Sequence, residues 1–310
     1  MRIAFLGTPA FAVPSLKMLI DEGHTLCVFT QPDKPQGRHA VLTPPPVKEL
    51  AQKHNIPVYQ PGRIRDQEGL ALLRAVGPDL MVTAAFGQIL SADNIAVPAF
   101  GCINVHGSLL PKYRGAAPIH WAVIDGEKKT GITTMLTDVG LDTGDILLAR
   151  ETLIQPDETA GELYERMAVL GAETLKETIA KLKEGTLSRT PQEETQATKC
   201  RMLKKEDGKL DFTQTAQCVH DRVRGTNPWP GAYAMLEDGL PLKIWRTRMT
   251  DVPVPLGLLP GACFGDTKCG LFVACADAAL ELLELQAPCC KRMAAKVYLC
   301  GRQLAGSRLL

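Results

Sequence analysis

The chain has 310 residues, more than one hydrophobic core usually organises, so we expect two domains. Its apolar fraction of 45% and charged fraction of 22% are ordinary for a soluble globular protein. With 35 Lys and Arg against 34 Asp and Glu, the net charge of +1 excludes a chain that binds nucleic acid through overall charge. Any RNA contact has to come from local patches or from shape.

Residues 1–7 lead straight into a strand pattern, with no apolar leader and no transit segment rich in Arg and Ser. No apolar run approaches the length that crosses a bilayer. We therefore expect a cytoplasmic protein that has no membrane partner. A monomer is expected as well.

Strand and helix patterns alternate over the first part of the chain. Residues 2–6 predict a buried strand, 11–22 a helix, and 24–30 the next strand. This order predicts a parallel sheet with helices on its faces, an α/β fold of the Rossmann-like class. Further strands are expected at 56–59, 79–84, 101–106, 131–137 and 145–153, and further helices at 47–54 and 160–184.

Residues 31–46, QPDKPQGRHAVLTPPP, interrupt these patterns. They are rich in Pro and Gly, have no periodicity and include Lys34, Arg38 and His39. We expect a long exposed loop, and loops of this length within a domain are often functional.

The sequence becomes polar from about 186 to 207, which predicts a linker. Short β-rich stretches punctuated by Gly and Pro follow at 209–212, 232–236, 241–248, 262–264, 269–275 and 279–285. That pattern is typical of a small β-barrel of the OB type. We assign the first domain to 1–189, the linker to 190–206 and the second domain to 207–310.

Ten cysteines are more than usual, and eight of them lie from Cys200 onward. No two form a C-x-x-C pair, the close spacing that structural zinc sites normally use. We expect small buried thiols in a reducing compartment, and no metal.

The strand at 101–106 carries two chemically useful side chains, within the stretch GCINVHGSLLPKYRG (101–115). Side chains two residues apart share a face, so Asn104 and His106 point the same way at the end of this strand. In open α/β sheets, ligands bind beyond the carboxyl ends of the strands. An amide and an imidazole are thus expected together at the site position.

A Gly-rich turn at 138–145, DVGLDTGD, adds carboxylates at Asp138, Asp142 and Asp145. The crossover order leads us to expect this turn at the same edge of the sheet. A calcium loop of the EF-hand type requires Gly and Glu at its sixth and twelfth positions, where this segment has Thr and Ala, so calcium is not expected.

An amide, an imidazole and a carboxylate together suit acyl transfer to an amine, without a metal or a covalent intermediate. An amine that attacks a carbonyl builds an oxyanion, to which Asn104 and a protonated His106 can donate hydrogen bonds. A carboxylate beside the ring would orient it and relay the proton that the amine loses. Each feature also has a plainer interpretation: a hydrogen-bonded scaffold histidine, a turn asparagine and a capped Gly-rich loop.

Long stretches of the chain match one known family in order and spacing. NVHGSLLPKYRGAAPI and DVGLDTGDIL resemble the folate-dependent formyltransferases. RIAFLGTPAFAVPSL, AAFGQILS, QPDKPQGR, ATKCRMLKKEDGKLDF and RVRGTNPWPGAY resemble the branch of this family that acts on methionyl-tRNA. The resemblance covers essentially the whole chain.

The resemblance implies transfer of the formyl group of 10-formyltetrahydrofolate to the amino group of methionine on initiator tRNA, for translation initiation. It implies a catalytic trio of Asn104, His106 and Asp142, the last because it fills the Asp of the family's LDTGD. It implies tetrahydrofolate contacts from two loops, one with Ser108, Leu109, Leu110 and Pro111 and one with Phe86, Gln88, Ile89 and Leu90. Arg38 occupies the position expected to meet the tRNA acceptor stem, and the OB-type domain is expected to lie against the tRNA.

Some positions depart from the family pattern. His39 follows Arg38 where the loop normally has Gly, and His120 stands where Gln is usual. Residues 206–310 hold 12 Lys and Arg against 11 Asp and Glu, which is less basic than expected of a tRNA-binding domain. Two outcomes stay open: the RNA contact is weak, or it is concentrated near Arg222, Arg224, Lys243, Arg246 and Arg248.

Three other functions stay open at this point. A formyltransferase for an amino sugar-nucleotide or a glycinamide ribonucleotide would share the catalytic motifs, but the loop at 31–46 is of the tRNA type. A nucleotide-binding oxidoreductase is disfavoured because the turn after the first strand lacks G-x-G-x-x-G. A non-catalytic RNA-binding protein is disfavoured by the intact trio.

Overall fold

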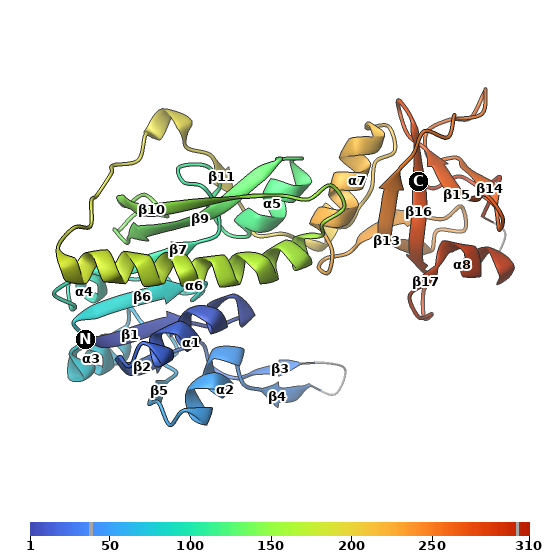
Figure 1. The fold of residues 1–310 in the computed structure, drawn as a ribbon. Helices are drawn as coiled ribbons and strands as arrows, with labels where there is room; N and C mark the ends of the chain where they lie inside the picture. Colours follow the sequence, from blue (N-terminus) through green and yellow to red (C-terminus); the bar gives the residue numbers. More distant parts are fainter. Residues whose placement is uncertain (37–39, 302–303) are drawn as a thin grey trace. The chain divides into compact units, whose positions relative to one another are not determined.

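Residues 1–36, 40–301 and 304–310 are described by the computed structural model, which Figure 1 shows as a ribbon. The chain divides into two units. The first comprises Met1–Gly115, Thr130–Thr152 and Tyr164–Cys200, and the second comprises Ala116–Lys129, Leu153–Leu163 and Arg201–Leu310. The domain limits expected at 189 and 206 stay a prediction.

A mostly parallel sheet is the framework of the first unit, with strand order β10–β9–β7–β6–β1–β2–β5. Its strands are β1 (Arg2–Gly7), β2 (Thr25–Phe29), β5 (Val58–Tyr59), β6 (Leu80–Ala84), β7 (Cys102–His106), β9 (Lys129–Leu136) and β10 (Ile146–Leu153). Neighbours from β5 to β7 are parallel, whereas β9 runs antiparallel to β7. The Rossmann-like α/β fold expected from the sequence is confirmed.

The chain reverses its course across the sheet after β1. From β1 it moves outward through β2 and β5, and it then returns to the other side of β1 at β6. Such a reversal leaves a crevice beyond the carboxyl ends of the strands, because the connections on its two sides diverge. The ends of β1, β6 and β7, at Gly7, Ala84 and His106, therefore form the expected binding edge.

Helices cover both faces of this sheet, which explains the continuous apolar sequence of its inner strands. The helices of the unit are α1 (Val13–Asp21), α2 (Pro46–Lys53), α3 (Gln67–Val76), α4 (Ala92–Ile95) and α6 (Ala160–Glu184). On one face, Leu6 packs in a buried cluster with Leu73 of α3. On the other, Gly171 of α6 approaches Val105 so closely that an added Cβ would lie 3.0 Å from it.

The first unit differs from the expectation at several places, among them 31–46 and α3. The segment 31–46 was expected to be a loop without regular structure, but it contains a short hairpin of β3 (Lys34–Gln36) and β4 (Val41–Thr43). Its apolar residues Val41 and Leu42 are more than 60% exposed, as expected of that segment. Helix α3, which contains Gly69, was not among the expected elements. The glycine is needed there, since a Cβ would lie 2.5 Å from the carbonyl oxygen of Ile64.

The second unit is built on an antiparallel sheet of order β12–β13–β16–β15–β14, with β17 paired to β16. These strands are β12 (Ala232–Met235), β13 (Pro241–Met249), β14 (Cys263–Asp266), β15 (Gly270–Ala274), β16 (Ala279–Gln286) and β17 (Met293–Ala294). Helices α5 (Pro118–Ile124), α7 (Ala216–Gly225) and α8 (Ala295–Gly301) belong to the same unit. The strand expected at 209–212 is reduced to a single bridge between Lys209 and Tyr233.

None of the helices in the described part of the chain combines the length and the apolar character that crossing a membrane requires.

A substitution at Gly131 of β9 tests how closely this strand packs against β10. A Cβ at this position would lie 2.2 Å from the carbonyl oxygen of Arg150 and 2.5 Å from Cδ2 of Leu109. We expect Gly131→Ala to lower the free energy of unfolding by roughly 1–3 kcal/mol, because the added methyl group overpacks the strand pair. Urea denaturation measures the change. The control is Gly62→Ala, where nothing lies within 4 Å; equal losses in both variants would contradict this packing.

Candidate active site

Asn104 lies in β7, and the neighbouring strand orients its amide. Thr83 of β6 is its register partner, and Thr83 Oγ1 donates a hydrogen bond to Asn104 Oδ1 at 2.8 Å. Because the oxygen end of the amide is occupied, the NH2 end faces Asp142, with Nδ2 at 3.3 Å from Oδ1 of that carboxylate. Sequence reasoning missed Thr83, since only the strand register reveals the pairing.

His106 ends β7, and only 6% of its side chain is exposed. Its Nε2 lies 3.0 Å from the carbonyl oxygen of Tyr113. A carbonyl oxygen can only accept, so Nε2 carries a proton in this contact. The other ring nitrogen, Nδ1, faces the site and lies 3.6 Å from Oδ2 of Asp142.

Asp142 reaches these two side chains from the loop between β9 and β10. Its Oδ2 also accepts a hydrogen bond from the Gly115 backbone N–H at 2.8 Å. Its φ of +54° lies in the left-handed region that residues other than glycine rarely adopt. The structure thus brings together Asn104, His106 and Asp142, and their catalytic roles stay a prediction.

The Asp142 loop reaches Asn104 by a route that differs from the expected one. Strand β9 is antiparallel to β7, with Leu136 opposite Ile103. The loop therefore leaves β9 beside the amino end of β7 and folds back toward Asn104. The turn was expected at the same edge as Asn104 and His106, and Asp142 does lie against both of them, although β9 runs against the parallel strands.

Asp138 and Gly144 shape this loop. Thr143 Oγ1 donates to the carboxylate of Asp138 at 2.7 and 2.8 Å, and the Gly140 N–H donates to it at 3.0 Å. A Cβ at Gly144 would lie 1.7 Å from the carbonyl oxygen of Leu136, so only glycine fits there. Asp138 is therefore a structural carboxylate of the loop, while Asp142 faces β7.

The three side chains form a compact polar group around one carboxylate. The Asn104 NH2 group can donate to an oxygen that gains negative charge, and so can Nδ1 of His106 when both ring nitrogens carry a proton. The carboxylate of Asp142 can accept a proton from an attacking amine. This geometry suits transfer of a small acyl group to an amine.

The loop after β6 holds one set of residues expected to contact folate. Phe86 is buried in the cluster on the α3 face of the sheet. Gln88 Oε1 accepts a hydrogen bond from the Ile64 N–H at 2.7 Å, so this side chain braces the loop. Ile89 is 70% exposed and Leu90 is half-buried. The loop thus offers an apolar surface next to the carboxyl edge.

The loop after β7 holds the other expected folate residues. Ser108 is fully buried, and its Oγ donates to the Lys112 carbonyl at 2.6 Å. Thr133 Oγ1 donates to the Ser108 carbonyl at 2.7 Å and accepts from the Leu110 N–H at 3.1 Å. Leu110 is buried, and the half-buried residues are Leu109 and Pro111. Internal hydrogen bonds thus hold this loop, and its contact with folate stays a prediction.

The basic residues expected near an RNA contact differ in their exposure and in the carboxylates they pair with. Arg38 lies outside the described residues. Arg224 is only 4% exposed and is paired with Asp221 at 2.6 Å, so its guanidinium is buried, and the RNA contact expected near it stays a prediction. Arg246 and Arg248 are more exposed, and each is paired with a carboxylate of the second unit, at 2.7 and 2.6 Å.

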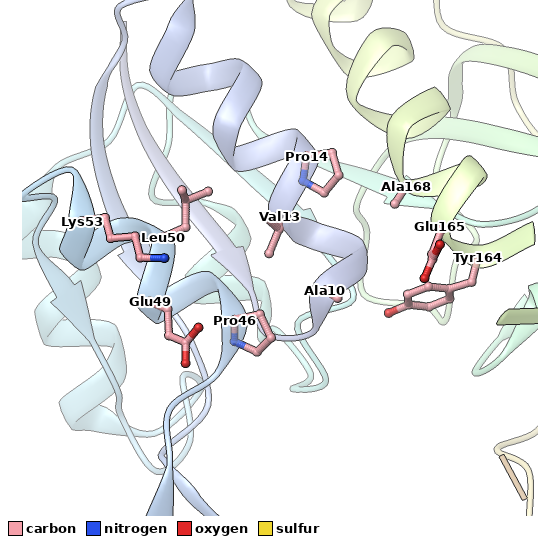
Figure 2. Close-up of a pocket in the computed structure, with 10 residues that line it drawn as sticks. All are labelled: Ala10, Val13, Pro14, Pro46, Glu49, Leu50, Lys53, Tyr164, Glu165 and Ala168. Carbon is pink, nitrogen blue, oxygen red and sulfur yellow. The ribbon is translucent and has the colours of Figure 1, made fainter. Parts of the chain in front are cut away.

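A cavity of about 440 Å³ lies between α1, α2 and α6. Figure 2 shows its largely apolar lining, with the charged side chains of Glu49, Lys53 and Glu165 among it. None of the trio residues lines this cavity. The candidate site is therefore defined by its hydrogen bonds and its place at the sheet, and not by this hollow.

Within the described residues, no group of three or more His, Cys, Asp or Glu side chains is placed to hold a metal ion. Burial raises the pKa of Cys27, Cys263 and Cys275 to about 12 and that of Cys102 to about 11. These four thiols stay protonated near neutral pH, so they behave as small core residues. The expectation of buried thiols is wrong for Cys218, Cys269, Cys289 and Cys300, which are exposed.

The chain matches known proteins over nearly its whole length. Residues 1–179 match the family described as "Formyl transferase", and residues 202–303 match "Formyl transferase, C-terminal domain". The chain is 51% identical to the methionyl-tRNA formyltransferase of Ruminiclostridium cellulolyticum, over 98% of this chain and 97% of that protein. It is 45% identical to the methionyl-tRNA formyltransferase of Clostridioides difficile, over 98% of each.

Solved structures show the same fold at low sequence identity. The N-formyltransferase from Helicobacter canadensis, in complex with folinic acid and dTDP-3-aminofucose, has a TM-score of 0.69 at 17% identity, over 90% of this chain and 98% of that one. HypX from Aquifex aeolicus, in complex with tetrahydrofolic acid, has a TM-score of 0.64 at 16% identity, over 96% of this chain and 47% of that one. Taken with the family matches and the close relatives, the chain belongs to the formyl transferase family, in the branch of the methionyl-tRNA formyltransferases.

Proposed function

We propose that this chain transfers the formyl group of 10-formyltetrahydrofolate to the free amino group of methionine on initiator methionyl-tRNA, for translation initiation. The observation that carries the proposal is the convergence of Asn104, His106 and Asp142 beside the carboxyl edge of the sheet. The substrates are inferred from the chain's relatives at 45–51% identity, which are methionyl-tRNA formyltransferases.

The trio acts on the carbonyl that the amine attacks. Asn104 Nδ2 donates a hydrogen bond to the oxygen as it becomes negative, and so does Nδ1 of a His106 ring that is protonated on both nitrogens, which stabilises the tetrahedral arrangement. Asp142 accepts the proton that the attacking nitrogen loses as the new C–N bond forms. When the bond from the formyl carbon to N10 of the folate breaks, that proton is returned to the leaving nitrogen. The products are formyl-methionyl-tRNA and tetrahydrofolate.

The loops after β6 and β7 fit a folate donor. A flat heterocycle needs an apolar wall with a few polar groups to fix its orientation. Exposed Ile89 and half-buried Leu90 offer such a wall, and Gln88 and Ser108 hold the two loops through their own hydrogen bonds. Bound folate would supply the activated formyl carbon, and the chain would place it against Asn104 and His106.

The RNA contact is proposed for Arg38 and for the surface of the C-terminal domain at 207–310. A guanidinium can form two parallel hydrogen bonds with one phosphate or stack on a base, and both contacts are available on a tRNA acceptor stem. We propose a monomer that works in the cytoplasm, with initiator tRNA and folate as its partners. Relatives near 50% identity favour tRNA as the acceptor over an amino sugar-nucleotide.

His106→Ala tests the catalytic assignment. Loss of the ring removes one donor to the oxyanion, so kcat should fall at least about a hundredfold. The binding of folate and of tRNA should change little, because the ring lies at the reacting centre. Formyl-methionine formed on initiator tRNA is measured over time, with exposed His54→Ala as the control. Turnover by His106→Ala at the wild-type rate would overturn the assignment.

Arg38→Ala tests the proposed RNA contact. Loss of a phosphate contact weakens tRNA binding equally in the ground state and in the transition state. The KM for methionyl-tRNA should therefore rise severalfold while the KM for the folate stays the same. Lys34→Ala, which removes a cation from the same segment, is the control. An equal rise of both KM values in Arg38→Ala would mean that this residue is not an RNA contact.

A further inference from the structure

Residues 190–200 connect the loop that carries Asp142 with the segment that follows β7. At one end, Thr190 and Ile146 exchange two backbone hydrogen bonds, just after the Asp142 loop. At the other end, β11 (Lys199–Cys200) pairs with β8 (Arg114–Gly115). The sequence predicts a linker here, and the structure fastens this stretch to both sides of the candidate site.

Gln192 is the contact of this segment with the Asp142 loop. Its Nε2 donates to the carbonyl oxygens of Asp142 and Gly144, both at 2.8 Å. Its Oε1 accepts from Nε of Arg114 at 3.0 Å, so both ends of the amide are used. The hydrogen bond from Gln192 therefore holds the backbone of Asp142, the residue whose carboxylate faces β7.

Arg114 fixes the position of Gln192 in turn. Only 2% of its side chain is exposed, and its two terminal nitrogens donate to the carboxylate of Glu194 at 2.7 and 3.0 Å. Hydrogen bonding to Glu194 raises the pKa of Arg114, so this guanidinium keeps its charge. A bidentate pair of this kind is directional, and it holds Nε toward Gln192.

Thr198 is the contact of this segment with the His106 side. Its Oγ1 accepts from the Tyr113 N–H at 2.8 Å, and its backbone N–H donates to the Pro111 carbonyl at 3.2 Å. The carbonyl of Tyr113 is the group that lies 3.0 Å from His106 Nε2. Thr198 thus holds both peptides that flank Tyr113: its Oγ1 binds the N–H of the Lys112–Tyr113 peptide, and its backbone carbonyl accepts from the Arg114 N–H at 2.9 Å, in the peptide whose carbonyl faces His106.

The two residues that this segment holds, Asp142 and Tyr113, both have a left-handed backbone conformation. Asp142 has a φ of +54° and Tyr113 a φ of +59°, and neither is glycine. Such conformations persist only where the surroundings hold them, and they cluster at functional sites. Here Gln192 holds the first and Thr198 the second, from one short segment.

We propose that Gln192 and Thr198 are positioning residues for the transfer reaction: Gln192 places the carboxylate of Asp142, and Thr198 places the Tyr113 carbonyl that orients His106. This inference rests on the proposed function of the trio. Neither side chain contacts the reacting atoms in it. Each acts through the backbone that it holds, so its loss should slow the chemical step and leave substrate binding in place.

The test compares matched pairs of variants in the full-length chain. Gln192→Leu and Thr198→Val remove the two side-chain contacts. Gln196→Leu and Thr195→Val are the controls, because these exposed side chains of the same segment bond to the carboxylate of Glu193. We expect kcat for formylation of methionyl initiator tRNA to fall about tenfold in the first pair, with both KM values within about twofold. Thr198→Ser keeps the hydroxyl and should restore the rate.

A double-variant cycle separates positioning from general damage. If Gln192 works by placing the Asp142 carboxylate, then Gln192→Leu should cost less than about twofold in an Asp142→Asn background, measured in single turnovers with enzyme in excess. A full tenfold loss in that background would overturn the proposal. Wild-type kcat in Gln192→Leu and Thr198→Val would overturn it as well.

Hydrogen exchange keeps the inference testable apart from the reaction. The Gly115 N–H donates to Asp142 Oδ2, so it reports on the placement of that carboxylate. Gln192→Leu should speed exchange in the peptide containing Gly115, and Gln196→Leu should not. Unchanged exchange would overturn the positioning role even if another acceptor were formylated. Full activity of Asp142→Asn alone would instead refute the proposed function of the trio.

Discussion

The placement of one carboxylate organises the candidate site. Asp142 lies beside the Asn104 amide at 3.3 Å and the His106 ring at 3.6 Å, and it accepts the Gly115 N–H at 2.8 Å. Its backbone occupies a left-handed conformation, which costs free energy and has to be held from outside. The rest of the local structure can be understood as the means of holding that residue against β7.

The sheet supplies the fixed side of this arrangement. Parallel pairing of β6 and β7 puts Thr83 opposite Asn104, and the resulting hydrogen bond turns the amide NH2 toward the site. Antiparallel β9 supplies the other side, because its final residues deliver the Asp142 loop next to β7. Rigid strands set two of the three groups, and a loop braced by Gln192 sets the third. Such a division suits a site in which about 1 Å of displacement can cost a hundredfold in rate.

Periodicity and motif spacing predicted the elements that depend on hydrophobic burial. The strand at 101–106 is β7 and the helix at 160–184 is α6, since a long apolar pattern has one favourable way to be buried. The two-residue spacing predicted that Asn104 and His106 share a face, and the family resemblance added Asp142. These inferences needed only local information or literal motifs.

Contacts that depend on register and on side chains bonded to backbone were beyond sequence reasoning. Thr83 is an ordinary strand residue until its partner across the sheet is known. The stretch 190–200 is polar and aperiodic, so it is typical of a linker, yet its order comes from Gln192 and Thr198 bonding to distant backbone groups. The direction of β9 could not be predicted for the same reason, because the residues of a strand do not show which strand it pairs with or in which direction.

We propose that this site formylates methionine on initiator tRNA from a folate donor. The most direct measurement supplies 10-formyltetrahydrofolate to the pure protein and follows formyl transfer to three acceptors: methionyl initiator tRNA, methionyl elongator tRNA and an amino sugar-nucleotide. We expect rapid formylation of the initiator tRNA and little of the other two. Formylation of the sugar with no reaction on tRNA would leave the chemistry of the trio intact and contradict the assigned acceptor.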